Sequence, residues 1–240
     1  MSPPPTDPLS PYRLGLLTNR WFAGLPSAMQ DVLLAGAVLH HLPSGERLFS
    51  RGDDYDGIYC VAKGALRVLG VHENGKEALL AMAEPYGWLG EIALFDGLPR
   101  THDAIAAQAS VVIRIPAAHL SDMLAVHPDW WRCFGVLLSQ KMRFAFMALE
   151  EAALLPIPLR IARRLVLMAE GYGELMDRTR RVLPLPQDQL ASMLSVSRQT
   201  INQVLRQFES QGLLKLNYRE MEILDLPGLR QAGSPADPVD

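Results

Sequence analysis

The 240-residue sequence predicts an α+β protein: an antiparallel β-roll (jelly roll) with flanking helices, then a long helix, then two short helices followed by a hairpin. Three observations predict this order. Short strand-like runs separated by glycines fill residues 46–116, a stretch almost free of glycine and proline follows them, and the last third contains two amphipathic helical patterns joined by a sharp turn. The chain is long enough for two modest domains, each with its own core.

Composition places the chain among ordinary globular proteins, with 49% hydrophobic and 20% charged residues. Its two cysteines, Cys60 and Cys133, are too few for a disulfide framework or a four-thiolate iron–sulfur cluster, and they suit a reducing cytoplasm. The N-terminal sequence MSPPPTDPLSP lacks the segments of a signal peptide, and no run reaches the ~18 apolar residues of a membrane span. We therefore expect a cytoplasmic protein with flexible termini at residues 1–20 and 231–240.

The charge is unevenly distributed along the chain. The formal net charge is −3, whereas residues 157–230 carry 11 Lys and Arg against 8 Asp and Glu. A mildly basic segment is typical of a module that binds a polyanion, although many solvated surfaces differ in charge by this much. The C-terminal segment is therefore where a polyanion-binding surface is expected.

The β-roll is predicted over residues 21–120. A short helical entry, Trp21–Ala37, precedes the strand-like runs, whose glycine spacing is typical of an antiparallel sandwich or barrel with tight turns. The sequence HENGKE at 72–77 contains Asn74-Gly75, the dipeptide that most strongly indicates a hairpin turn.

A long helix is predicted over residues 121–155, with Pro128 in the first turn after a break. Its heptad positions form an apolar seam with one lysine in it: Trp131, Phe134, Leu138, Lys141, Ala145, Ala148 and Ala152. Such a seam often pairs with its copy in a homodimer. A helix that lies on its own domain would show the same stripe, so the seam alone leaves both interpretations open.

Pro156 and Pro158 end this helix, because proline cannot continue the hydrogen-bond ladder. We place the domain boundary there. The second domain is predicted over residues 156–230 and begins with a helix, Leu159–Glu170.

Two helices at a sharp turn are predicted within LPQDQLASMLSVSRQTINQVLRQFESQGLLKL. Pro186 opens the first helix, Ser197 caps the second, and Gly212 ends it. Ser195 takes the turn position that often holds glycine, so we expect a left-handed backbone there at modest cost. The residues LLKLNYREMEILDL then form a short hairpin, which could lie along a duplex as a wing.

The outward face of the second helix carries residue types that read DNA. Arg bonds guanine, Gln and Asn bond adenine, and Ser or Thr hold phosphate oxygens. The candidate DNA-binding residues are Ser197, Arg198, Gln199, Thr200, Asn202, Gln203 and Arg206. The pattern A-x-x-L-x-V-S-R-x-T-I favours a helix-turn-helix over a small helical domain with a polar face.

A candidate anion site lies within LGEIALFDGLPRTHDA, residues 89–104. Gly90-Glu91-Ile92 are predicted to begin a short helical turn whose free N–H groups form an anion-binding concavity, and Arg100 can return there to grip a phosphate with its planar fork. Glu91 would then need a neutral donor such as a ribose hydroxyl. A nucleotide with its phosphate fused to its ribose meets both demands. The alternative is a structural salt bridge between Arg100 and Glu91 with no ligand.

These motifs carry a resemblance. Residues 90–94 with Pro99-Arg100 resemble the phosphate-binding cassette of cyclic-nucleotide-binding domains, and RLFSRGDDYDGIYCVAKGALRV resembles their strand–glycine signature. From about Leu25 to Leu229 the chain is similar to the CRP/FNR family of bacterial transcription regulators. The resemblance implies a homodimer joined through the long helix, a palindromic operator in double-stranded DNA with half-sites ~34 Å apart, and RNA polymerase as a further candidate partner. An effector in the roll would reorient the C-terminal domains.

The effector-binding residues that the resemblance assigns are Gly90, Glu91, Ile92, Arg100, Thr101 and His102. Bulky His102 stands where cyclic-AMP-binding members have a small residue, with Asp103 beside it. Those members also offer a Thr-Ser pair to adenine, and the matching positions here are Ala145 and Phe146, which cannot make those hydrogen bonds. We therefore expect a cyclic nucleotide or cyclic dinucleotide other than cyclic AMP. Gln199 and Gln203 differ from those members' base readers, so the half-site should differ as well.

Other functions remain as alternatives. A family member that binds no nucleotide, and that senses a redox or gas signal or acts constitutively, is the alternative within the family. An enzyme on a metal-binding jelly roll would need a cluster of ligands, but His40 and His41 point to opposite faces of a strand. The spacing of His72, His102 and His119 is not that of metal ligands. We expect no metal and no catalytic residue.

Overall fold

The computed structural model describes residues 8–72, 75, 77–176 and 180–234, and the chain divides into two compact units, residues 1–142 and 143–240. The division falls inside the long helix, whereas the sequence places the domain boundary at Pro156. The last turns of that helix are thus grouped with the C-terminal unit.

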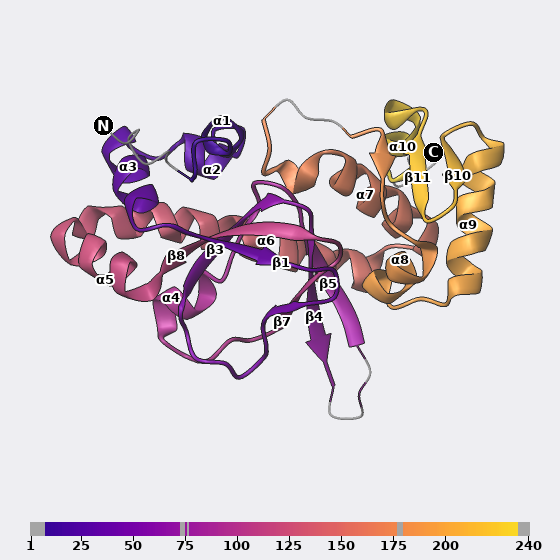
Figure 1. The fold of residues 1–240 in the computed structure, drawn as a ribbon. Coiled ribbons are helices and arrows are strands. Elements are labelled where there is room, and N and C mark those ends of the chain that lie inside the picture. The colour runs from indigo at the N-terminus through magenta and orange to yellow at the C-terminus, as the bar shows by residue number, and fades with distance from the viewer. Residues whose placement is uncertain (1–7, 73–74, 76, 177–179, 235–240) are drawn as a thin grey trace. The chain divides into compact units, whose positions relative to one another are not determined.

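Two four-stranded antiparallel sheets form the roll of the first unit, which confirms the predicted β-roll (Figure 1). The first sheet has the order β1 (Val38–Leu42), β8 (Ser110–Pro116), β3 (Gly57–Lys63) and β6 (Trp88–Leu89). The second sheet has the order β2 (Arg47–Phe49), β7 (Asp103–Ala106), β4 (Leu66–Val71) and β5 (Glu77–Ala83). β4 and β5 pair with Val71 opposite Glu77. The hairpin turn predicted between them includes Asn74, which lies outside the described residues.

Strand β3 is buried on both faces, because side chains alternate along a strand and each face meets a different core. Ile58 and Cys60 belong to the core that the first sheet shares with the helices of this unit. Tyr59 and Val61 belong to a second core, which contains residues of both sheets. Cys60 is therefore a core thiol, the role that its strand-like surroundings favour.

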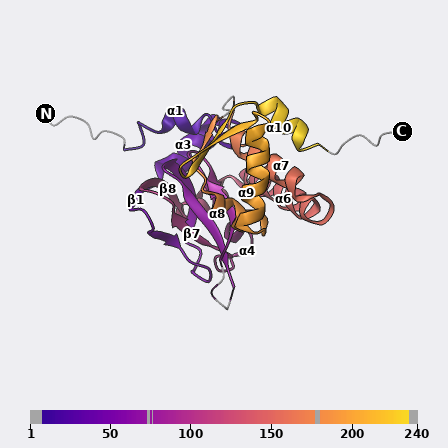
Figure 2. The ribbon, with the colours of Figure 1, turned by 90° about the vertical axis from the view of Figure 1, so that its right-hand side faces the viewer.

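Three short helices contribute residues to the core of the first sheet: α1 (Arg13–Leu16), α2 (Arg20–Ala23) and α3 (Ser27–Ala35) (Figures 1 and 2). The single helix predicted over residues 21–37 is broken because Pro26 pushes the preceding residue away from helical backbone, and Pro26 itself is extended with ψ 140°. Leu9 and Leu16 are buried in the core, so this part of the N-terminal segment, which we expected to be flexible, is packed.

The predicted long helix consists of α5 (Ala117–Val126), a 3₁₀ turn η1 (Pro128–Trp130) and α6 (Trp131–Leu154). The break falls at Pro128, as its sequence position predicts. Phe134 and Leu137 are buried in the roll's core, and Trp21 Nε1 donates a hydrogen bond to Cys133 O (2.7 Å). The first turns of α6 therefore lie on their own domain. Other large apolar side chains of α6 are exposed, namely Trp131, Val136, Met142, Phe146, Met147, Leu149 and Leu154.

The second unit contains α7 (Ile157–Ala169), a 3₁₀ turn η2 (Gly171–Gly173), β9 (Val182–Leu183), α8 (Gln187–Leu194), α9 (Arg198–Ser210), β10 (Leu214–Asn217), β11 (Glu220–Ile223) and α10 (Leu226–Ala232). β11 lies between β10 and β9 in an antiparallel sheet. The helix-turn-helix and its hairpin are confirmed. The sequence interpretation missed α10, which packs on α7 and reaches two residues past the expected domain end at 230.

Candidate nucleic-acid interface and anion cradle

The turn between α8 and α9 has the backbone that the sequence predicts. Ser195 is left-handed, with φ +54°. Its N–H donates to Ser192 O (3.2 Å), and Val196 N–H donates to Ala191 O (3.0 Å), which satisfies the last carbonyls of α8. Arg160 of α7 donates to Leu194 O (2.8 Å), a contact that no local pattern predicts because the two residues are 34 positions apart.

Ser197 caps α9: its hydroxyl accepts a hydrogen bond from Thr200 N–H (3.0 Å) and contacts the Thr200 hydroxyl (2.8 Å). This is the N-cap geometry that the sequence predicts. Since the Ser197 and Thr200 hydroxyls contact each other at the first turn of α9, they stabilise the start of the helix.

The two faces of α9 divide as its sequence pattern predicts. The buried residues are Ile201, Val204, Leu205 and Phe208. Within the helix the exposed candidates are Arg198, Gln199, Gln203 and Arg206, whereas Thr200 and Asn202 are half-buried; the cap Ser197 is also exposed. Asn202 Nδ2 donates to Gln187 Oε1 of α8 (2.9 Å), so part of its bonding capacity holds the two helices together. The structure thus gathers four exposed polar side chains on one helix edge.

The hairpin β10–β11 is attached to α9 by a hydrogen bond from Leu216 N–H to Glu209 Oε1 (2.8 Å). Tyr218 lies at its tip and is 90% exposed. The hairpin and the recognition-type helix therefore form one connected element of the C-terminal unit.

The other candidate site lies in the β-roll, where β6 leads into α4 (Ile92–Asp96). Gly90 has φ +94°, and a Cβ there would lie 2.7 Å from Arg100 Nη1. Only glycine lets the arginine approach this closely. Because α4 is only five residues long, the capacity of this cradle to bind an anion depends chiefly on Arg100.

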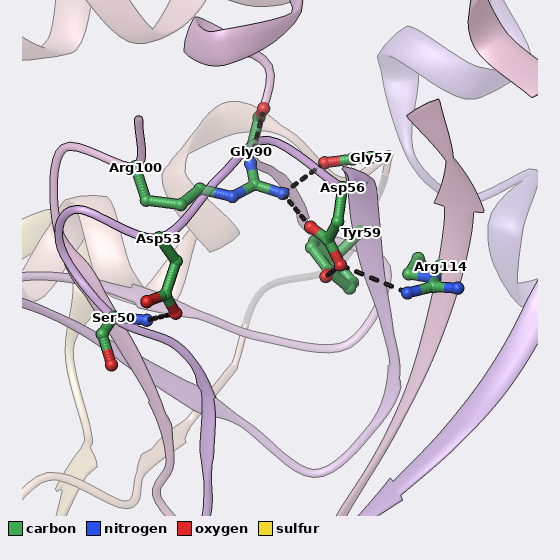
Figure 3. Close-up of polar contacts among 8 residues, drawn as sticks. All are labelled: Ser50, Asp53, Asp56, Gly57, Tyr59, Gly90, Arg100 and Arg114. Carbon is green, nitrogen blue, oxygen red and sulfur yellow. Dashed lines mark hydrogen bonds and ion pairs between the residues drawn. The ribbon is translucent and has the colours of Figure 1, made fainter. Parts of the chain in front are cut away.

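Arg100 is 4% exposed, and its guanidinium is held at three protein oxygens (Figure 3). Nη2 donates to Asp56 Oδ1 (2.6 Å) and to Gly57 O (2.6 Å), and Nη1 donates to Gly90 O (3.1 Å). The guanidinium also lies over three aromatic rings, those of Phe49, Tyr55 and Tyr59, at 4.6, 5.2 and 5.4 Å from their centroids. Arg100 therefore returns to Gly90 as predicted, but it is already paired.

The predicted alternative of an Arg100–Glu91 salt bridge is wrong. Glu91 is 3% exposed, and its Oε2 binds Lys141 Nζ of α6 (2.8 Å), which also donates to Trp88 O. The one lysine of the α6 seam thus enters the cradle. Sequence reasoning missed both Asp56 and Lys141 as partners, because they lie 44 and 50 residues from the groups that they bind.

Asp56 binds two arginines at once. Its Oδ1 accepts from Arg100, and its Oδ2 accepts from Arg114 of β8 (3.2 Å) and from the Tyr59 hydroxyl. Burial raises the pKa of Asp56, but the hydrogen bonds from Tyr59 and Arg100 and the two guanidinium charges outweigh burial and leave the pKa below its ordinary value. Burial raises the pKa of Tyr59, and its bond to the Asp56 carboxylate adds to that shift. Asp56 is therefore a carboxylate, and Tyr59 a neutral donor, at neutral pH.

Thr101 and His102 contact each other, with Thr101 Oγ1 2.9 Å from His102 Nδ1. Burial and the nearby Arg51 lower the pKa of His102. Asp103 instead accepts from Arg47 Nη1 (2.9 Å) and from Arg51 N–H (2.6 Å). His102 and Asp103 are adjacent in the sequence, but their side chains have different partners.

The residues of the cradle fit a phosphate-bearing group. Arg100 Nε is buried and has no hydrogen-bond partner in the described part of the chain, so it is a donor with capacity for a ligand oxygen. Within that same part, no group of three or more His, Cys, Asp or Glu side chains could hold a metal ion. No helix among the described residues has the length and apolar character to cross a membrane.

Comparison with known proteins finds a family match for each of the two domains. Residues 39–127 match the family described as cyclic nucleotide-binding domain, and residues 159–232 match the Crp-like helix-turn-helix domain. A relative from Mycobacterium tuberculosis, named a CRP-like cAMP-activated global transcriptional regulator, is 26% identical over 76% of this chain and 82% of its own length.

Solved structures agree on the fold. FixK2 from Bradyrhizobium japonicum matches with a TM-score of 0.73 at 17% identity, over 84% of this chain and 99% of its own. A CRP/FNR family transcriptional regulator from Thermus thermophilus matches with a TM-score of 0.65 at 25% identity, over 82% of this chain and 98% of its own. The two domains, in this order and on this fold, show that the chain belongs to the CRP/FNR family of transcriptional regulators.

Proposed function

We propose that this chain acts as a homodimer that binds a palindromic operator in double-stranded DNA, and that a phosphate-bearing effector in the β-roll controls this binding. The observation that carries the DNA part is the outer edge of α9, where Arg198, Gln199, Gln203 and Arg206 are exposed together. Arg and Gln side chains on a helix in the major groove can read guanine and adenine by paired hydrogen bonds.

The second half of α6 supports a dimer. Phe146 is 63% exposed and Leu149 is 65% exposed, whereas the first turns of the same helix bury Phe134 and Leu137 in the core. Apolar side chains on a long helix are stabilised by pairing with an equivalent helix. The occupant that we assign to this face is α6 of a second copy, which would also provide the two-fold symmetry that a palindromic operator requires.

The effector part rests on Arg100, whose buried Nε lacks a partner among the described residues. The first ligands to test are cyclic nucleotides, since the Mycobacterium tuberculosis relative is named as cAMP-activated. Ala145 and Phe146 cannot hydrogen-bond an adenine edge, so a cyclic nucleotide other than cyclic AMP or a cyclic dinucleotide is the better candidate. The two cysteines, neither of which forms a disulfide, agree with action in the cytoplasm, where RNA polymerase is a candidate partner.

A second candidate is a regulator that binds DNA without any nucleotide. The pairing of Arg100 with Asp56 favours it, because the arginine that would bind a phosphate is neutralised by the protein itself. The two candidates differ in whether a ligand is needed, and they agree on DNA binding.

The test is selection of binding sites from a pool of random duplexes, together with sedimentation of the purified protein. We expect a dimer and an enriched inverted repeat whose half-sites lie about 34 Å apart, one helical turn. Retention should weaken steeply as salt rises, because phosphate contacts release counterions. A monomer, or a pool without an enriched repeat at any effector concentration, would contradict the proposal.

A further inference from the structure

We propose that Asp56 occupies the effector's phosphate position in the effector-free protein, so that a phosphate-bearing effector binds only by displacing the Asp56 carboxylate from Arg100. The inference rests on the proposed control of this protein by an effector in the β-roll. It adds the residue that determines which ligands can enter that site.

The shape of the guanidinium limits how Arg100 can hold a phosphate. Its five N–H groups form two edges that can hold an oxyanion by two parallel bonds, one through Nε and Nη2 and the other through Nη1 and Nη2. Both edges need a hydrogen of Nη2, and Nη2 of Arg100 already donates to Asp56 Oδ1 and Gly57 O. The unpaired Nε–H therefore offers a phosphate one bond only. A paired grip requires one of the two oxygens to leave Nη2.

Asp56 is the partner that can leave. Gly57 O belongs to the backbone of β3, and Gly57 itself is packed so closely that a Cβ would lie 2.1 Å from Ile115 O. The Asp56 carboxylate, in contrast, ends a side chain that is 42% exposed and can turn about its own bonds (Figure 3). Displacement of Asp56 therefore needs no change of the sheet.

The displaced carboxylate keeps its other partners. Asp56 Oδ2 binds Arg114, whose side chain is 30% exposed, and accepts from the Tyr59 hydroxyl. These contacts can hold Asp56 after Oδ1 leaves Arg100, so the carboxylate is not left unpaired. A buried charge is costly when it loses its only partner, and this arrangement avoids that cost on the Asp56 side.

The burial of Arg100 determines which ligands can replace the Asp56 carboxylate. The Arg100 side chain is 2% exposed, so loss of its carboxylate leaves a buried cation unless another anion replaces it. A phosphate oxygen restores the charge pair and adds a bond to Nε. A neutral nucleoside cannot do so, even if its sugar and base fit. The cradle therefore selects an anionic phosphate ligand through competition with Asp56.

The experiment measures binding of three probes by titration calorimetry: cyclic AMP, cyclic GMP and cyclic di-GMP, with adenosine and guanosine as phosphate-free references. We expect Asp56→Ala to bind at least one phosphate probe roughly tenfold more tightly or better than the unmutated protein, since a charge-assisted competitor is removed. Asp56→Asn should show a smaller gain, because its amide oxygen can still accept from Nη2. Neither substitution should improve nucleoside binding.

The matched control is Asp53→Asn. Asp53 lies in the same loop, and its carboxylate accepts from Ser50 N–H (2.7 Å) instead of binding the guanidinium (Figure 3). Removal of this negative charge tests whether a general increase in electrostatic attraction explains the gain in phosphate binding. Because the Asp53 carboxylate does not bind the guanidinium, we expect a much smaller gain than for Asp56→Ala. Arg100→Gln combined with Asp56→Ala should abolish the gain.

Three outcomes overturn the competition. The first is weaker phosphate binding by Asp56→Ala and Asp56→Asn, which would make Asp56 a positioning residue for Arg100. The second is an equal gain in Asp53→Asn. The third is no nucleotide binding in any variant whose circular dichroism and melting remain cooperative. In that third case, operator binding is read separately. If all variants bind the selected operator, the DNA-binding proposal stands; if the unmutated protein does not bind it, the DNA-binding proposal fails as well.

Discussion

The anion cradle and the outer edge of α9 use charged side chains in opposite ways. In the cradle, Arg100 and Glu91 are nearly fully buried, and each is paired with a group from a distant part of the chain. On α9, Arg198 and Arg206 are exposed. Buried charges must be paired to be tolerated, whereas exposed charges keep their hydration and stay available to a partner. We therefore expect the α9 edge to bind DNA without rearrangement, and the cradle to admit only a ligand that replaces existing contacts.

The difference predicts that the same kind of substitution has different consequences in the two regions. In the cradle it should change both ligand binding and stability. On the α9 edge it should change DNA binding alone.

The largest effect is expected for Arg100→Gln. We expect it to abolish binding of phosphate-bearing probes. We also expect it to lower the free energy of unfolding by about 2–3 kcal/mol, less than the ~3–5 kcal/mol of a fully buried pair because Asp56 keeps Arg114. Calorimetric titration and urea unfolding measure the two quantities. An unchanged free energy of unfolding would mean that the buried Arg100–Asp56 pair contributes little to stability. The cradle would then not differ from the α9 edge in this respect.

The next largest effect is expected for Arg198→Ala. We expect a loss of about 1–3 kcal/mol in binding to the preferred operator and relaxed selection at one base position, as for an arginine that reads guanine. The free energy of unfolding should stay within about 0.5 kcal/mol of the unmutated value, because the side chain is exposed. Anisotropy titrations on matched and altered operators measure the first effect. An equal loss on every sequence would identify a phosphate contact instead.

The division between the two regions also explains what the sequence could predict. The faces of α9, the cap at Ser197 and the left-handed Ser195 depend on residues within a few positions, so local patterns suffice. Arg100 and Gly90 are also close in the sequence, 10 residues apart. The groups that pair with Arg100 and Glu91 lie 44 and 50 residues away from them. Asp56 is one of three aspartates in a short loop, and nothing local distinguishes it from the others as the partner of Arg100.

The fold shows the same limit. The strands and the break at Pro128 follow from glycine spacing and proline chemistry, whereas β9 is two residues long and has no pattern of its own. The helix α10 did carry a local signal: the Asp225 side chain accepts from Gly228 N–H (3.0 Å), and Pro227 lies in the first turn. Asp225 with Pro227 two positions later therefore indicates the start of this helix.

A smaller effect is expected on protein stability when the pH is lowered. The pKa of Asp56 is below its ordinary value of 3.8 in the folded chain, so its contribution to stability is present above the unfolded pKa and is lost as pH falls through the folded pKa. We expect the unmutated protein to exceed Asp56→Asn in stability at pH 6, and the gap to shrink progressively below about pH 4. Urea unfolding across this range measures the gap. The corresponding gap between the unmutated protein and Arg198→Ala should not depend on pH.

The smallest effect is expected at the turn between α8 and α9. Ser195 adopts φ +54°, a conformation that glycine reaches without a steric cost, and its side chain is exposed. Ser195→Gly should therefore raise the free energy of unfolding by about 0.5–1 kcal/mol, with operator affinity unchanged because no α9 side chain moves. Thermal unfolding and anisotropy measure the two effects, and Ser195→Ala is the control that keeps the strain. Loss of operator binding in Ser195→Gly would mean that the serine itself takes part in DNA contact, and the α9 edge would then extend into the turn.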